Sequence, residues 1–148
     1  MAGNSIREQI LLAVMAAVRP PVESLGATLH RSPTVAIGRE QCPALVVFPE
    51  SESITERAND RVTRELTVRL VALARAVPPA SPETDADRLL TAAHAALMAD
   101  RNLGGLALGL REQDCEWDVE DADAVAAAIP ARYGITYRTL DTDLSTKG

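Results

Sequence analysis

One alternating stretch, Arg61–Ala76, constrains the fold of this chain more than any other. Its even-numbered positions are almost all apolar, whereas Glu65, Thr67 and Arg69 make the odd-numbered positions of its first half polar. A period of two predicts a β-strand with one buried face. From Leu70 onward both parities are apolar, so we expect the second half to be covered on both faces. Such a strand would be roughly twice the usual length and would cross a whole sheet.

A second apolar run, Ala44–Phe48, precedes this strand, and the polar segment Pro49–Asp60 connects the two. The pattern predicts an antiparallel hairpin with a long charged loop. Loops of this length either are simply solvated or reach a neighbouring molecule. If the loop reaches a neighbour, the candidate contact residues are its charged side chains and those just after it: Glu50, Glu52, Glu56, Arg57, Asp60, Arg61 and Arg64.

A helix is expected near the start of the chain. Ser5 and Glu8 have the spacing of a capping box, in which each side chain bonds the other residue's backbone N–H. The apolar positions that follow recur with helical spacing as far as Val18. Pro20 and Pro21 then predict the end of the helix, because proline lacks a backbone donor and clashes with the preceding turn.

The middle of the chain predicts a short strand, Ala27–Arg31, followed by a loop, Ser32–Gln41, with few large apolar residues. A second helix is expected over about Pro82–Ala99. Ser81 suits its N-cap and Pro82 its first position.

The segment from residue 106 to residue 119 contains two alternating apolar sets on opposite parities. A continuous strand cannot place both sets on one face, so we expect a bulge or break near Arg111–Gln113. The first set is Leu106, Leu108 and Leu110, and the second is Cys115, Trp117 and Val119.

The last part of the chain predicts one more strand. Alternation is clear from about Ile129 to Leu140, after an acidic turn at Glu120–Asp123, whereas Ala124–Ala128 is compatible with helix or strand. Residues 1–4 and about 141–148 are expected to be flexible termini. The fold class is therefore α/β (α+β): a mixed or antiparallel sheet with a long central hairpin, flanked by two helices, in a single domain of 148 residues.

Composition narrows the classes of function. The net charge of −6 argues against a general affinity for phosphate backbones. Only four side chains are Phe, Trp or Tyr, so a stacking platform for single-stranded nucleic acid is not expected. The apolar run Ile10–Val18 is too short to span a bilayer.

Four alternating carboxylates form the most conspicuous polar set: Asp114, Glu116, Asp118 and Glu120. On a strand they would share one face. Calcium binding is not expected, because the glycine and distal glutamate of an EF-hand loop are missing. A paired-carboxylate hydrolase would need an apolar pocket to raise one pKa, and nothing nearby supplies it. The set is therefore interpreted as a face turned to solvent or to a lumen, or as a surface with a functional negative field.

No catalytic motif is evident, so we expect neither an enzyme nor a cofactor or metal site. His30 and His94 have no partner at metal-ligand spacing. Cys42 and Cys115 are expected to be buried free thiols of a protein made in a reducing cytoplasm.

The order of segments resembles the tail terminator (minor tail protein) family of lambda-like long-tailed bacteriophages. The resemblance covers about Ser5–Thr139, through the segments IREQILLAVMAAV, CPALVVFPESESI, VTRELTVRLVALAR, ADRLLTAAHAALMAD and ARYGITYRT. The helix exit Leu103–Leu106 and the terminal Ile135–Thr139 carry most of it. No single motif is diagnostic, because these proteins have no active site.

The resemblance implies a subunit of a hexameric ring that caps the tail tube, ends its polymerisation and offers a surface for head–tail joining. The implied partners are copies of the same chain, the tail-tube protein and a head-completion or connector protein. DNA would pass through the channel without specific binding. The implied location is the head-proximal end of the tail in the virion, after assembly in the host cytoplasm. The alternatives are another neck or tail subunit (tail tube or head closure) and a small-molecule-binding α/β domain.

Overall fold

The computed structural model describes residues 3–76, 81–121 and 125–148. It confirms the predicted α+β fold, with two helices beside one mixed sheet. In chain order the elements are α1 (Ile6–Ser24), β1 (Thr28–Arg31), the 3₁₀ turn η1 (Arg39–Gln41), β2 (Ala44–Ala58), β3 (Arg61–Ala76), α2 (Pro82–Met98), β4 (Gly109–Cys115), β5 (Asp118–Asp121) and β6 (Val125–Leu140).

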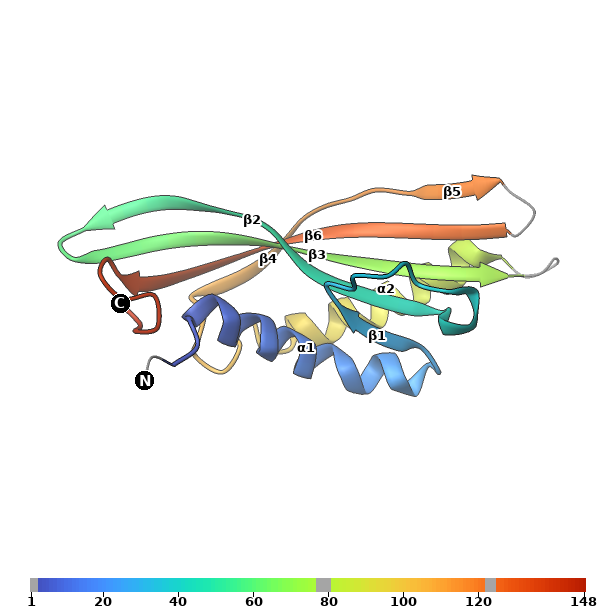
Figure 1. Ribbon diagram of the computed structural model, residues 1–148, viewed down its shortest axis with the longest axis horizontal. Helices are drawn as coiled ribbons and strands as arrows, with labels where there is room; N and C mark the ends of the chain where they lie inside the picture. The colour runs from blue at the N-terminus through green and yellow to red at the C-terminus, as the bar shows by residue number, and fades with distance from the viewer. Residues whose placement is uncertain (1–2, 77–80, 122–124) are drawn as a thin grey trace.

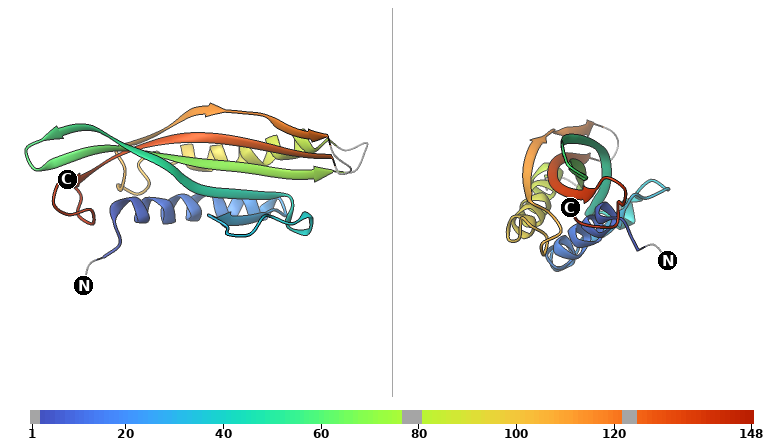
Figure 2. Two further views of the ribbon diagram at one scale, coloured as in Figure 1. Left: turned by 45° about the horizontal axis from the view of Figure 1, so that its top comes forward. Right: turned by 90° about the vertical axis from the view of Figure 1, so that its left-hand side faces the viewer.

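The six strands form a sheet in the order β1-β2-β3-β6-β4, and β5 continues the line of β4 along the same side of β6. Among the strands of the described residues, only β1 and β2 pair in parallel; the other pairs are antiparallel. Both helices cover the same face, called here the helix face (Figures 1 and 2). The opposite face, called the outer face, has no helix from the described part of the chain. The β2–β3 hairpin extends beyond the start of α1 (Figure 1).

Strand β3 is the centre of this sheet, as predicted. It pairs with β2 on one side, and with β6 on the other from Arg61 to Ala76. The buried side chains of β3 are all even-numbered and point to the helix face: Val62, Leu66, Val68, Leu70, Ala72 and Ala74. Burial of this one parity against the helices fixes the register of the sheet, because a one-residue slip would expose all of them.

The second half of β3 is covered unequally on its two faces. Leu70 is fully buried on the helix face, whereas Val71 and Leu73 on the outer face are only half-buried. Ile37, from the segment between β1 and β2, lines a small cavity of about 80 Å³ together with Leu73 and Ala128. The prediction of cover on both faces therefore holds fully for one face and partly for the other.

The prediction of a loop over Pro49–Asp60 is wrong, because strand β2 continues to Ala58. Only a tight turn joins β2 to β3, and Asn59 there has a φ of 58°. Two bulges interrupt the pairing, between Pro49 and Ser51 and between Ile54 and Glu56. Because the projecting half of β2 is largely exposed, it lacks the apolar alternation by which a strand is recognised in sequence.

The prediction that α1 ends before Pro20 and Pro21 is also wrong, since the helix runs to Ser24. Neither proline has a backbone N–H to donate to the carbonyl four residues earlier. For Pro20 that carbonyl belongs to Ala16, which is exposed, so water can take the place of the missing donor. Val22, beyond the prolines, is fully buried. Packing of this last turn therefore outweighs the local preference of proline.

The remaining helix and strand predictions are confirmed in part. Helix α2 begins after Ser81, whose Oγ accepts a hydrogen bond from the backbone N–H of Thr84 at 3.4 Å. The expected irregularity in β4 lies between Glu112 and Asp114. Leu106 and Leu108, however, precede the strand, which begins at Gly109.

The structure corrects the expected burial of both cysteines and several expectations about β4 to β6. Trp117 and Cys115 are exposed rather than buried, and Cys42, just before β2, is half-buried. Strand β6 begins at Val125, so strand is the correct alternative where the described residues begin again. Of the expected acidic turn, Glu120 and Asp121 belong to β5, while residues 122–124 lie outside the described residues.

The segment after β6 folds back toward the start of the chain. The Ile6 N–H donates to the Leu144 carbonyl at 2.8 Å, and Lys147 forms an isolated bridge with Thr139. The Asp141 N–H also donates to the carbonyl of Asp60 in the hairpin turn at 2.7 Å. The segment therefore runs from the hairpin turn back to the start of α1, where sequence alone predicts a flexible terminus (Figure 1).

Candidate assembly surface

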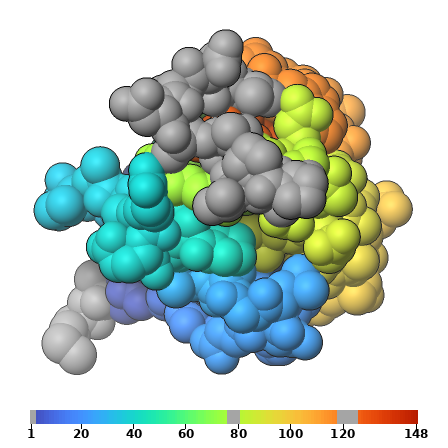
Figure 3. Space-filling view, turned by 90° about the vertical axis from the view of Figure 1, so that its right-hand side faces the viewer, coloured from blue at the N-terminus to red at the C-terminus, as the bar shows by residue number. Residues whose placement is uncertain are grey.

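The sheet has two free edges of different composition. Strand β1 pairs with β2 only over Ala44–Val47, so the side of β2 from Phe48 to Ala58 has no neighbouring strand among the described residues. On the opposite side of the sheet, β4 and β5 have no described strand beyond them. Figure 3 shows the segment after β1 (cyan to teal) on one flank and the chain after α2 (yellow to orange) on the other.

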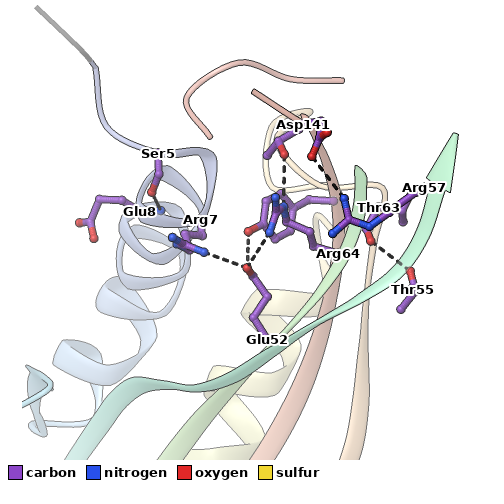
Figure 4. A network of polar contacts seen from close by, with 11 residues as sticks. Ser5, Arg7, Glu8, Glu52, Thr55, Arg57, Thr63, Arg64 and Asp141 are labelled. Atoms are coloured by element: carbon purple, nitrogen blue, oxygen red, sulfur yellow. Dashed lines mark hydrogen bonds and ion pairs between the residues drawn. The ribbon is translucent and has the colours of Figure 1, made fainter. Parts of the chain in front are cut away.

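Two of the predicted contact residues, Glu52 and Arg64, are taken up in holding the hairpin to the rest of the fold. Their side chains are only 15% and 11% exposed. Glu52 Oε2 accepts hydrogen bonds from Arg7 Nη1 at 2.8 Å and from Arg64 Nη1 at 3.4 Å (Figure 4). The Tyr137 hydroxyl donates to Glu52 Oε1, and Arg64 Nε donates to Thr139 Oγ1 at 3.2 Å.

This Glu52 cluster joins α1, β2, β3 and β6 at one point. Burial, followed by the hydrogen bond to Glu52, raises the pKa of Tyr137, so the hydroxyl keeps its proton and remains a donor. Glu52 and Arg64 therefore anchor the hairpin and are not free to meet a partner.

Glu50 is engaged on the outer face. Arg132 Nε donates to Glu50 Oε2 at 2.8 Å, and Arg132 Nη1 donates to Asp114 Oδ2 at 3.2 Å. Glu116 lies near the same guanidinium, with its Oε1 4.0 Å from Nη1. The hydrogen bonds that Arg132 donates to Glu50 and then to Asp114 raise its pKa. The sequence did not predict that Arg132 binds two carboxylates. Its own segment gives no sign that Glu50 of β2 and Asp114 of β4 lie on either side of it.

The charges that remain open to solvent lie at the hairpin tip. Glu56, Arg57, Asp60 and Arg61 are exposed, and Arg57 Nη1 is 3.2 Å from an Asp141 carboxylate oxygen. Of the predicted contact residues, these four are the ones the fold leaves available to a partner.

The four alternating carboxylates are spread over the end of β4, the link after it and β5. Asp114 and Glu116 are exposed beside Arg132. Asp118 and Glu120 belong to β5, and their side chains lie outside the described residues. Although Cys115 is exposed as a residue, partial desolvation of its thiol, followed by the carboxylate of Glu112, raises the pKa of that thiol, which makes it a poor nucleophile.

His94 has a structural partner rather than a catalytic one. Its Nδ1 lies 2.7 Å from the Tyr133 hydroxyl and 3.8 Å from a Glu112 carboxylate oxygen. Burial raises the pKa of Tyr133, so its hydroxyl stays protonated. Within the described ranges, no group of three or more His, Cys, Asp or Glu side chains could hold a metal ion.

Two open hollows lie against the free strands. One, of about 510 Å³, is lined on the outer face by Glu65, Arg111 and Thr136 among others. The other, of about 430 Å³, lies between the first turns of α1 and the free edge of β2, with Arg7, Pro49 and Ser51 in its lining. Their shape suits a docked chain segment better than an enclosed small molecule.

Glu8 forms the other close ion pair of this region and links α1 to the end of β1. Both of its carboxylate oxygens accept hydrogen bonds from the Arg31 guanidinium at 2.6 Å. These bonds lower the pKa of Glu8. The pair fixes β1 against the helix, at the position where the free edge of β2 begins.

We expect Glu8→Gln to reduce the loss of stability in acid. Arg31 holds the folded pKa below the unfolded value of about 4.3, so the unfolded chain takes up the proton first as the pH falls. The stabilisation is therefore complete above about pH 5 and is lost on acidification through the folded pKa. Urea unfolding at several pH values should show a smaller drop toward pH 3 for the variant. Arg31→Gln should give the same flatter profile, and an unchanged profile in both variants would contradict the assignment.

A scan of protein-family models and a search of curated proteins match nothing to this chain. No helix in the described part of the chain is long and apolar enough to cross a membrane. The functional conclusion therefore depends on the geometry of the edges and on the order of segments in the sequence.

Proposed function

We propose that this protein is a structural virion subunit that closes into a ring and caps the tail tube of a long-tailed bacteriophage. The observation that carries the proposal is the pair of unlike free edges on opposite sides of one sheet. A ring needs a heterologous interface, in which one patch of each subunit binds a different patch of the next. Free strand edges supply such patches through backbone hydrogen bonds.

The remaining parts of the proposal come from the resemblance of the segment order to tail terminators. The ring would be a hexamer at the head-proximal end of the tail, bound to the tail-tube protein on one side and to a head-completion protein on the other. The net charge of −6 is compatible with DNA moving through the channel without being held. No catalytic activity and no cofactor are assigned.

Assembly of the purified protein tests this function. Electron microscopy and native mass measurement should show a closed six-fold ring, and adding the ring to growing tail tubes should stop their elongation. Reversing the exposed tip charges with Glu56→Lys and Arg57→Glu should abolish capping while the folded protein remains. Glu23→Lys, at an exposed position of α1, is the matched control and should cap normally.

Each other outcome identifies an alternative. Indefinite polymers would indicate a tube subunit, and rings that bind only the head side would indicate a head-closure protein. A monomer whose melting temperature rises with a small ligand would favour the small-molecule-binding domain. Normal capping by the tip variant would show that the hairpin tip does not meet the tube.

A further inference from the structure

On each side of the sheet the edge strand changes, and the two changes occur at the same level along the strands. The register of the strands defines cross-strand rows, and one row contains Arg31, Val47, Leu70, Ala131 and Cys115. Arg31 is the last residue of β1, and Cys115 is the last residue of β4. Along the sheet from the hairpin tip, β4 ends on one side at this row, and the pairing of β1 begins on the other side at the same row.

Space for an additional strand exists beside this change of edge strand. Where β1 stops, the hollow of about 430 Å³ continues its line between α1 and the free side of β2. Its floor includes Leu11 and Leu66, and its open rim is formed by Pro49–Glu52. An incoming strand about 4.8 Å from β2 would extend the sheet there.

We propose that the strand filling this hollow is β4 of a second copy of the chain, paired antiparallel to β2. Strands β2, β3, β6 and β4 alternate in direction, so β2 and β4 of one subunit run in opposite directions. A neighbour related by rotation about an axis along the strands presents its β4 antiparallel to β2. This inference rests on the proposed ring and specifies its subunit interface.

The rows give the register of this interface. Ser51, Thr67, Gly134 and Arg111 share a row, so Ser51 of one subunit lies opposite Arg111 of the next. Ser51 pairs with Thr67 and Arg111 with Gly134, which places both side chains on the outer face. Toward the hairpin tip, each of the two edges also presents one exposed apolar residue.

These residues are Ile54, which pairs with Arg64, and Leu108, which directly precedes β4 and donates its N–H to the Thr136 carbonyl at 2.7 Å. Ile54 is 44% exposed and Leu108 is 54% exposed in the isolated subunit. Large exposed apolar side chains on two free edges are the composition expected of an interface core. The register that pairs Ser51 with Arg111 brings these two side chains to the same end of the interface.

Cysteine crosslinking tests the register in a Cys42→Ser/Cys115→Ser background. Ser51→Cys with Arg111→Cys places two cysteines directly opposite across the interface, within the Cα separation that a disulfide allows. Mild oxidation of the assembled ring should convert most of the protein into a ladder of linked oligomers up to ring size. Each single variant should stay unlinked.

Ser51→Cys with Glu112→Cys is the matched control, because Glu112 pairs with Tyr133 on the helix face. It should give no ladder. Equal linking in this control, or linked dimers from Ser51→Cys alone, would overturn the proposed register. Intact rings without links in the Ser51/Arg111 pair would overturn the interface but leave the ring, whereas absence of any ring would overturn both.

Charges at the two exposed apolar positions give an independent readout. Ile54→Lys or Leu108→Asp alone should dissociate the ring, because each places a charge without a partner in the interface. Rings that persist in both single variants would also overturn the inference.

Discussion

Replacing Glu52 with alanine is expected to lower the free energy of unfolding by about 3 kcal/mol. The change leaves the Arg64 guanidinium in a largely buried position with one hydrogen bond, to Thr139, and removes the acceptor of the Tyr137 hydroxyl. Breaking a buried ion pair from one side leaves a charge that neither water nor protein compensates. For a chain of this size the melting temperature should fall by about 6–12 °C. Urea and thermal unfolding followed by circular dichroism measure both.

Glu56→Ala is the matched control for this variant. It removes the same side chain from an exposed position of the same strand and should change the free energy of unfolding by less than about 0.5 kcal/mol. Replacing both charges, with Glu52→Leu and Arg64→Met, should recover much of the loss, because no unpaired charge then remains at the pair. Equal effects of Glu52→Ala and Glu56→Ala would show that the cluster does not anchor the hairpin.

The contrast between Glu52 and Glu56 explains why sequence assigned both to a contact surface. They have the same parity along the chain, so an uninterrupted strand would place them on one face. The bulge between Ile54 and Glu56 changes this: Glu52 pairs with Leu66 on the helix face, whereas Glu56 pairs with Thr63 on the outer face. A bulge adds a residue without leaving a mark in the apolar pattern, so these roles follow only from the register.

The parts of the fold that sequence predicted correctly are those determined by neighbouring residues. The alternation of β3 and the N-caps Ser5 and Ser81 need no information about distant segments. The second bond of the expected capping box does depend on a distant segment, because the Glu8 carboxylate accepts from Arg31 instead. The parallel pairing of β1 with β2 and the extension of β2 beside β3 depend on segments far apart in the chain. Local propensity therefore predicted a loop where tertiary pairing makes a strand.

The candidate surface is even less accessible to sequence reasoning. An edge is defined by the absence of a neighbouring strand, so it exists only once the strand order is known. Arg132 acquires its role because β6 lies between β3 and β4, which brings Glu50 and Asp114 within reach of one guanidinium. The exposed charges Glu56 and Arg57 could be named from sequence, but could not be separated there from Glu50 and Glu52.

Leu70→Ala is expected to lower the free energy of unfolding by about 4 kcal/mol. Leu70 is fully buried at the middle of β3 and points to the helix face, in the apolar cluster shared with α1 and α2. Removing its isobutyl group loses the transfer free energy of the side chain. It also leaves a cavity in a region held on both sides by β2 and β6, which cannot collapse easily. Urea unfolding measures the change.

Leu73→Ala tests whether the two faces of β3 differ as the structure indicates. The substitution is chemically identical, but Leu73 is half-buried on the outer face and lines the small cavity near Ile37. Because part of its surface is already in contact with water, we expect a loss of about 1–2 kcal/mol. A loss at Leu73 equal to that at Leu70 would mean that the outer face is packed as tightly as the helix face. The outer face would then be a second core, and an assembly surface there would be confined to the hairpin half of the sheet.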